Sequence, residues 1–134
     1  MSGRVAVDTN VLLRFMVRDD EAQAQEAGAL LGSADIVVVP TLVFAELVWA
    51  MRQGYRISRA DVAAGIRVLI AAGNLEFDRP AVLAGLAMMD KGGDFADGVI
   101  HYEATRARSA TLATFDRKLA ARLPAGAVTL LGAG

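Results

Sequence analysis

"RVAVDTNVLLRFMV", residues 4–17, decides the fold class. The apolar, β-branched start predicts a strand at Arg4–Val7, and Asp8 then separates this strand from a helix over residues 9–17. The same change recurs at residues 36–54, where a strand at Ile36–Val39 ends at Pro40 and an apolar helix follows. Strands that alternate with helices are typical of a parallel sheet covered on both faces. The sequence therefore predicts an α/β fold with a small parallel sheet flanked by helices.

The remaining elements follow the same alternation. Helices are expected at residues 19–33, 58–73, 79–93, 94–109 and 117–123, and short strands at 75–78, 110–116 and 127–131. Ser58 has the side chain of an N-cap, while Gly32 and Gly73 are expected to end their helices. No linker or repeat interrupts the chain, so residues 1–134 are expected to form a single domain.

Composition excludes several classes of protein. With 54% hydrophobic and 22% charged residues, the chain is not expected to be disordered. Its apolar runs are shorter than the roughly 20 residues of a membrane span, and no signal peptide is expected. The absence of cysteine excludes disulfides and thiolate metal sites and fits a cytoplasmic protein. A net charge of −1 argues against a bulk attraction to nucleic acid.

Five carboxylates stand where acids are unusual. Asp8 and Asp116 directly follow apolar strands, and ligands of open α/β sheets bind at that edge. Glu46 stands between apolar neighbours, where an unpaired charge would cost several kcal/mol if buried. Asp94 and Asp97 are three apart, so they project from one side of the helix over residues 94–109.

Each of these acids also has an ordinary interpretation. Asp94 could be a helix cap, Asp97 a favourable first-turn charge, and Asp8 and Asp116 turn or cap residues. Glu46 could form a surface ion pair with an arginine, either Arg52 or Arg56.

Taken together, the acids favour a metal site. Four or five carboxylates in one cleft cannot all stay ionised without a cation. With no cysteine and one histidine, the donors are oxygen atoms, which select Mg²⁺ or Mn²⁺ over zinc. In this interpretation Phe95, Val99 and Ile100 bury one side of the helix while its two aspartates face the metal. Gly92 and Gly93 then allow a tight turn beside it.

Four segments, in order, resemble the PIN-domain ribonucleases, and most closely the VapC-type toxins of toxin–antitoxin pairs. These segments are VDTNVLLR, AEL, DFADGVI and TFDRKLA. The four acids of the family fall on Asp8, Glu46, Asp97 and Asp116, and Asp94 matches an additional acid found in many members. The chain departs from the toxins at Gly98, where Ala is common. We expect this difference to cost under about 1 kcal/mol in helix propensity.

The resemblance implies a three-layer PIN-like fold and cleavage of RNA by a cytoplasmic endoribonuclease that depends on Mg²⁺ or Mn²⁺. Asp8, Glu46 and Asp97 would hold a metal, with Asp116 and Asp94 serving a second metal or a bound water. Thr9, Asn10 and Thr114 could hydrogen-bond these carboxylates, although turn and cap roles suit them equally. The expected partners are an RNA substrate, a cognate antitoxin and a second copy in a homodimer, with no membrane.

Three alternatives are weighed against the toxin. One is a housekeeping PIN-type nuclease without an antitoxin. A phospho-receiver signalling domain would need a lysine after a late strand, whereas Lys118 stands in a helical run. An aspartate-nucleophile phosphatase would need a second aspartate two residues after the first, and that position is Asn10.

Two weaker signals complete the interpretation. Trp49 and the pair Met88 and Met89 are interpreted as core or interface residues rather than as surfaces for stacking RNA bases. Four arginines are candidates for a rim that contacts phosphates, although a solvated surface explains them as well. They are Arg14, Arg18, Arg52 and Arg56.

Overall fold

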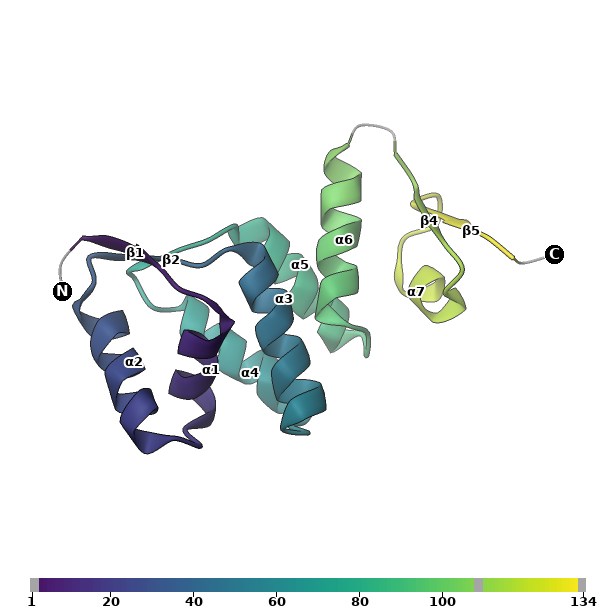
Figure 1. Ribbon diagram of the computed structural model, residues 1–134. Coiled ribbons are helices and arrows are strands. Elements are labelled where there is room, and N and C mark those ends of the chain that lie inside the picture. Colours follow the sequence, from purple (N-terminus) through teal and green to yellow (C-terminus); the bar gives the residue numbers. More distant parts are fainter. Residues whose placement is uncertain (1–2, 108–109, 133–134) are drawn as a thin grey trace. The chain divides into compact units, whose positions relative to one another are not determined.

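The computed structural model describes residues 3–107 and 110–132 of the chain. The chain divides into two compact units, Met1–Asp78 and Arg79–Gly134. Both units combine helices with short parallel strands, so the predicted α/β class is confirmed (Figure 1). The expectation of a single domain stays a prediction.

The N-terminal unit is a three-stranded parallel sheet with its connecting helices. Its elements are β1 (Arg4–Ala6), α1 (Thr9–Val17), α2 (Glu21–Ser33), β2 (Ile36–Val38), α3 (Thr41–Trp49), the π-helix η1 (Ala50–Gly54), α4 (Arg59–Ile70) and β3 (Leu75–Glu76). The strands lie in the order β1-β2-β3, with Val37 of β2 between Val5 and Leu75. All three strands run the same way, so their carboxyl ends share one edge of the sheet.

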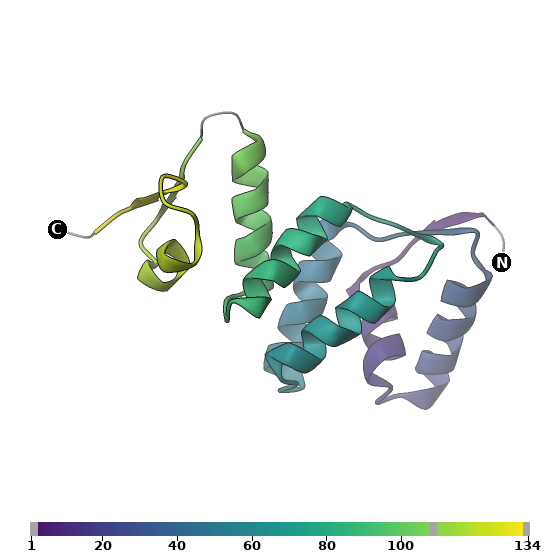
Figure 2. The ribbon, with the colours of Figure 1, turned by 180° about the vertical axis from the view of Figure 1, so that it is seen from behind.

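The C-terminal unit pairs two long helices and adds a two-stranded parallel sheet. Its elements are α5 (Arg79–Asp90), α6 (Phe95–Arg106), β4 (Leu112–Thr114), α7 (Arg117–Arg122) and β5 (Val128–Leu130). Leu112 of β4 pairs with Val128 of β5. Over the described residues, the strands form two sheets in place of the one sheet that the sequence predicted. Helices α5 and α6 lie side by side (Figures 1 and 2).

An apolar core holds the N-terminal unit together. Leu12, Val37, Phe44 and Ile66 are fully buried, and the ring of Phe44 lies 5.5 Å from that of Phe77. Each such side chain contributes about 1.5–3 kcal/mol by leaving water. No polar or charged residue is buried in the part of the chain that the structure describes.

Polar side chains mark most of the helix starts. Ser58 accepts a hydrogen bond from the backbone N–H of Asp61 at the start of α4, as predicted, and Asp20 caps α2 in the same way. The predicted ends were less accurate. Gly32 lies inside α2, and α4 ends three residues before Gly73.

Two glycines let α5 and α6 approach closely. A Cβ atom at Gly98 would collide with the carbonyl oxygen of Ala84 and lie 2.8 Å from Met88 Cβ. A Cβ at Gly85 would lie 2.6 Å from the buried ring of Phe95. The prediction that Gly98 matters only through helix propensity is therefore wrong, because the helix–helix contact leaves no room for a side chain.

Candidate active site

Asp8 lies where the first strand gives way to the first helix. It follows β1 by two residues, with Val7 hydrogen-bonded to Val38 of the neighbouring strand. The Asp8 carboxylate accepts the N–H of Val11 at 3.2 Å and so caps α1. One oxygen of this exposed side chain has that role, and the other remains available to a ligand.

Glu46 lies on the solvent-exposed face of α3, so its carboxylate does not carry the cost of a buried, unpaired charge. The helix buries Val43, Phe44 and Leu47 instead. Thr9 Oγ1 donates a hydrogen bond to Glu46 Oε1 at 2.9 Å, as predicted for a residue that orients a carboxylate. Because Thr9 directly follows Asp8, this bond joins the start of α1 to Glu46.

Asp94 occupies the N-cap position of α6 without capping it. Its backbone is extended, but its side chain accepts no hydrogen bond from the first turn. Asp8, Asp20 and Asp116 all cap their helices through a carboxylate oxygen. A cap role therefore does not account for the Asp94 side chain, which is exposed.

Asp97 is a half-buried carboxylate beside two other acids. Burial raises its pKa above the ordinary value, and the charges of Asp94 and Asp116 raise it further, while Arg122 opposes the shift. The three aspartates thus lie within electrostatic reach of one another. A cation bound among them would relieve their repulsion.

Asp116 is held in place at the start of α7. Its Oδ1 accepts the N–H of Leu119 at 3.0 Å, and its own N–H donates to Thr114 Oγ1 at 3.0 Å. Thr114 therefore contacts the backbone of Asp116, which is the turn role that the sequence offered as the alternative to a bond with a carboxylate. Both bonds fix the direction of the segment that carries the acid.

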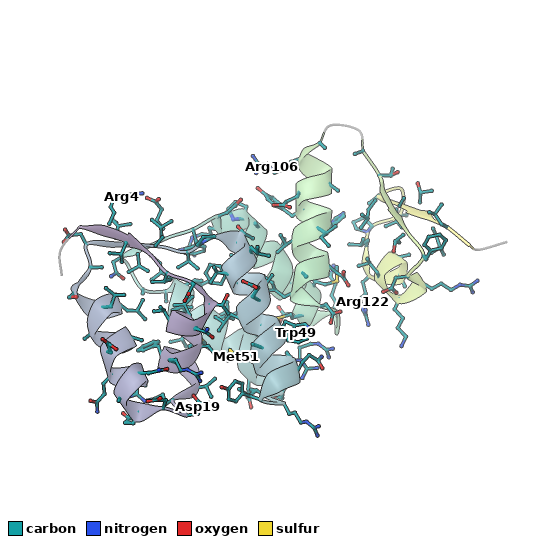
Figure 3. The ribbon with its side chains drawn as sticks, in the orientation of Figure 1. Arg4, Asp19, Trp49, Met51, Arg106 and Arg122 are labelled. Carbon is teal, nitrogen blue, oxygen red and sulfur yellow. The ribbon has the colours of Figure 1, made fainter. Side chains whose placement is uncertain are left out.

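A tight turn delivers the chain to Asp94, as predicted from the glycine pair. Gly92 has a φ of 86°, which few other residues adopt, and its N–H bonds to Met89 of α5. A Cβ at Gly93 would lie 2.8 Å from Met88 Sδ and 3.3 Å from Arg122 Cδ. Arg122, labelled in Figure 3, therefore lies against this turn as well as near Asp97.

The burial predicted for the apolar helix residues is right for most side chains and wrong for Ile100. Ile100 was expected to be buried, but it is 49% exposed, whereas Phe95 and Val99 are buried. Met88 and Met89 lie in the core as expected, and Trp49 is 68% exposed. Each exposed residue lies on a helix with apolar residues on several faces, and such a pattern does not indicate which face packs.

Most of the arginines predicted to contact phosphates are bonded to other groups of the protein. Arg14 forms an ion pair with Asp19 at 2.8 Å and a hydrogen bond with Tyr55, and Arg18 forms an ion pair with Glu21 at 2.7 Å. The remaining two are Arg52, which donates to the carbonyl of Ile57, and Arg56, which has a positive φ. Neither Arg52 nor Arg56 forms an ion pair with Glu46 among the described residues.

The acids thus form two groups, one in each unit. Asp8 and Glu46 belong to the first group, and Asp94, Asp97 and Asp116 to the second. Among the described residues, no three acid or histidine side chains lie close enough to form a ready-made metal site. The donors are nevertheless all carboxylate oxygens, which a divalent hard cation prefers. The side chain of Asp94, which makes no cap bond, and the raised pKa of Asp97 both fit such a cation.

An aspartate follows each of the strands β1 and β4, and this arrangement is typical of α/β proteins whose acids can bind a divalent cation. Residues 5–123 match the PIN domain, and the chain belongs to this family. PIN domains are generally nucleases, which are hydrolases, and PIN nucleases generally use divalent metals. A comparison with curated proteins gives no match. No helix among the described residues is long and apolar enough to cross a membrane.

Proposed function

We propose that this PIN-domain protein is an endoribonuclease that depends on Mg²⁺ or Mn²⁺ and acts as the toxin of a type II toxin–antitoxin pair. The observation that carries the nuclease is the match of residues 5–123 to the PIN domain, together with the half-buried carboxylate of Asp97, whose pKa is raised by burial and by Asp94 and Asp116. A protein gains nothing in stability from such repulsion, so the arrangement favours a cation-binding role.

The proposal assigns Asp8, Glu46 and Asp97 to the metal, with Asp116 and Asp94 serving a second cation or the attacking water. When bound, the cation supplies Lewis-acid chemistry, because it polarises the phosphate and makes water more acidic. The assignment follows the order of acids in the family motif.

The neighbouring side chains have the tasks of holding and balancing these acids. Thr9 fixes one oxygen of Glu46 and leaves its other oxygen for a ligand. The capping bond of Asp116 likewise fixes one of its carboxylate oxygens and leaves the other for a ligand. Arg122 lowers the pKa of Asp97 and so favours the ionised form that a cation needs.

An apolar groove in the N-terminal unit supports the proposal that an antitoxin binds this protein. This groove encloses about 970 Å³ and is lined mainly by side chains of α1, α2 and α4, among them Phe15, Leu31 and Val68. Val68 is 76% exposed and adds an apolar side chain to the rim of this groove. A groove of this kind suits an apolar protein segment. The homodimer and a cytoplasmic location remain part of the proposal.

Cleavage of a labelled RNA in Mn²⁺ tests the nuclease. Asp8→Asn, Glu46→Gln and Asp97→Asn should each slow cleavage by more than about 100-fold, since even the hydrogen-bond partners of metal ligands change activity 10- to 100-fold. Asp61→Asn is the matched control, because Asp61 is an exposed acid on α4 outside both groups. Chelator must silence the wild type. Cleavage by Asp97→Asn at the wild-type rate would show that the assigned site is wrong.

Expression in cells tests the toxin. The wild type should arrest growth, Asp97→Asn should not, and co-expression of the neighbouring reading frame should restore growth. Normal growth at high soluble expression, combined with cleavage in vitro, would favour a housekeeping nuclease.

A further inference from the structure

Phe115 is a large aromatic side chain left in solvent. It is 75% exposed and stands between β4 and Asp116. Its ring nevertheless lies against the chain on one side, because a Cβ at Gly132 would be 3.2 Å from its Cδ1 and 3.6 Å from its Cε1. The ring is thus supported at one edge and otherwise open, which is the arrangement that a stacking partner needs.

Two exposed cations follow this ring. Arg117 and Lys118 occupy the first turn of α7, and neither takes part in an ion pair within the described ranges 3–107 and 110–132. Arg14 and Arg18 differ from them in this respect, since both are bound to acids. Unpaired cations are free to bind phosphate through their side chains.

We propose that the segment Phe115–Lys118, with the sequence FDRK, binds a single-stranded stretch of the RNA substrate. Phe115 stacks on one unpaired base, and Arg117 and Lys118 bind the phosphates beside it. Asp116 stands between the ring and the cations in the sequence. RNA bound to both would therefore place its sugar–phosphate backbone beside a proposed metal ligand. The inference rests on the proposed nuclease and adds the residues that hold the substrate beside one of its acids.

The chemistry of the segment explains this choice of substrate. A base within a duplex is already stacked on both faces, whereas an unpaired base can place one face on an aromatic ring. Stacking needs no particular base, so Phe115 would select for strandedness and not for sequence.

Charge favours RNA over a protein partner at this surface. The exposed ring is followed at once by one acid and two cations, in contrast to the apolar groove of the N-terminal unit. Residues 79–134 carry seven Lys and Arg against five Asp and Glu, while residues 1–78 carry seven against ten. The cationic surplus thus belongs to the unit that presents Phe115.

Fluorescence anisotropy in EDTA, where metal-dependent cleavage is silent, tests the inference on the full chain. The probes are a labelled single-stranded RNA, the same RNA annealed to its complement, and an abasic strand of equal length. Phe115→Ala should weaken binding of the single strand by roughly 5- to 150-fold, and Phe115→Tyr should retain most of it. Neither variant should change the weaker binding of the other two probes.

Two further variants separate the roles of ring and cations. Arg117→Gln should reduce the slope of log affinity against log salt by about 0.7 on the single strand, whereas Phe115→Ala should leave that slope unchanged. Leu83→Ala, at another exposed apolar residue of the same unit, is the matched control and should bind like the wild type.

The outcomes distinguish this inference from the proposed function. If the wild type cleaves RNA in Mn²⁺ but Phe115→Ala binds the single strand as tightly as wild type, the stacking role is refuted and the nuclease stands. If binding depends on Phe115 but no divalent cation supports cleavage, the nuclease fails and the stacking role stands. A change in oligomeric state on light scattering, with unchanged RNA affinity, would make Phe115 a protein contact and overturn the inference.

Discussion

Gly98→Ala is the substitution that tests the packing beneath Asp97 most directly. Alanine is favoured over glycine inside a helix by about 1 kcal/mol, so propensity alone predicts a more stable protein. The structure predicts the reverse. The new Cβ would collide with the carbonyl oxygen of Ala84 and lie 2.8 Å from Met88 Cβ, where contacts under 3.0 Å essentially never occur. A backbone carbonyl cannot rotate away, so α6 must move off α5.

The magnitude follows from these opposing effects. Overpacking in a tight contact costs about 1–3 kcal/mol, and a backbone neighbour favours the upper end. After the gain in propensity, we expect a net loss of about 2 kcal/mol, or a melting temperature lower by roughly 6–10 °C.

Calorimetry against a matched glycine decides the question. Gly32 lies inside α2 with no atom within 4 Å of an added Cβ, so Gly32→Ala should stabilise the protein by up to about 1 kcal/mol. The close packing of α5 and α6 would be refuted if Gly98→Ala melted at or above the wild type while Gly32→Ala rose as expected.

Three further predictions concern the acids and one cap. In chelator, Asp97→Asn should melt above wild type at neutral pH. Because folding raises the pKa of Asp97, its contribution to stability is present below the unfolded pKa and lost as pH rises through the folded one. The difference in melting temperature should therefore shrink on acidification, and a difference that grows would contradict the raised pKa. Mn²⁺ at a hundredfold excess over its Kd should stabilise the wild type by about 2.7 kcal/mol and Asp97→Asn far less in thermal melts; equal shifts would remove Asp97 from the metal. Ser58→Ala should lower the free energy of unfolding by about 1 kcal/mol in urea, and Ser58→Asp should restore it; no loss would show that the cap is dispensable.

Local signals in the sequence were sufficient to predict most elements. Apolar runs indicated β1, β2, β4 and β5, and the side chain of Ser58 indicated where α4 begins. Helix ends were harder to predict because Gly32 and Gly73 are common stop signals that this chain does not use as stops. The change from α3 to the π-helix η1 is a change in hydrogen-bond register, and periodicity over residues 41–54 does not reveal it.

The candidate site was predictable in its chemistry but not in its surroundings. Strand ends indicated Asp8 and Asp116, and helical spacing indicated that Asp94 and Asp97 share a side. The exposure of Glu46 could not be predicted from the sequence, because α3 is apolar on most faces and only tertiary packing selects the face that is buried. The tight contact at Gly98 depends on α5, whose position no local pattern encodes.

The uneven division of charge between the two units has a consequence for how quickly RNA is captured. A net charge of −1 for the whole chain predicts weak repulsion of a polyanion. Electrostatic forces between exposed charges are screened beyond about 8–10 Å at physiological salt. An approaching RNA strand therefore responds to the charges of the nearest side chains and not to the net charge of the protein. The cationic surplus of residues 79–134 would therefore steer the first encounter. Added salt should then slow association even though the protein is acidic overall.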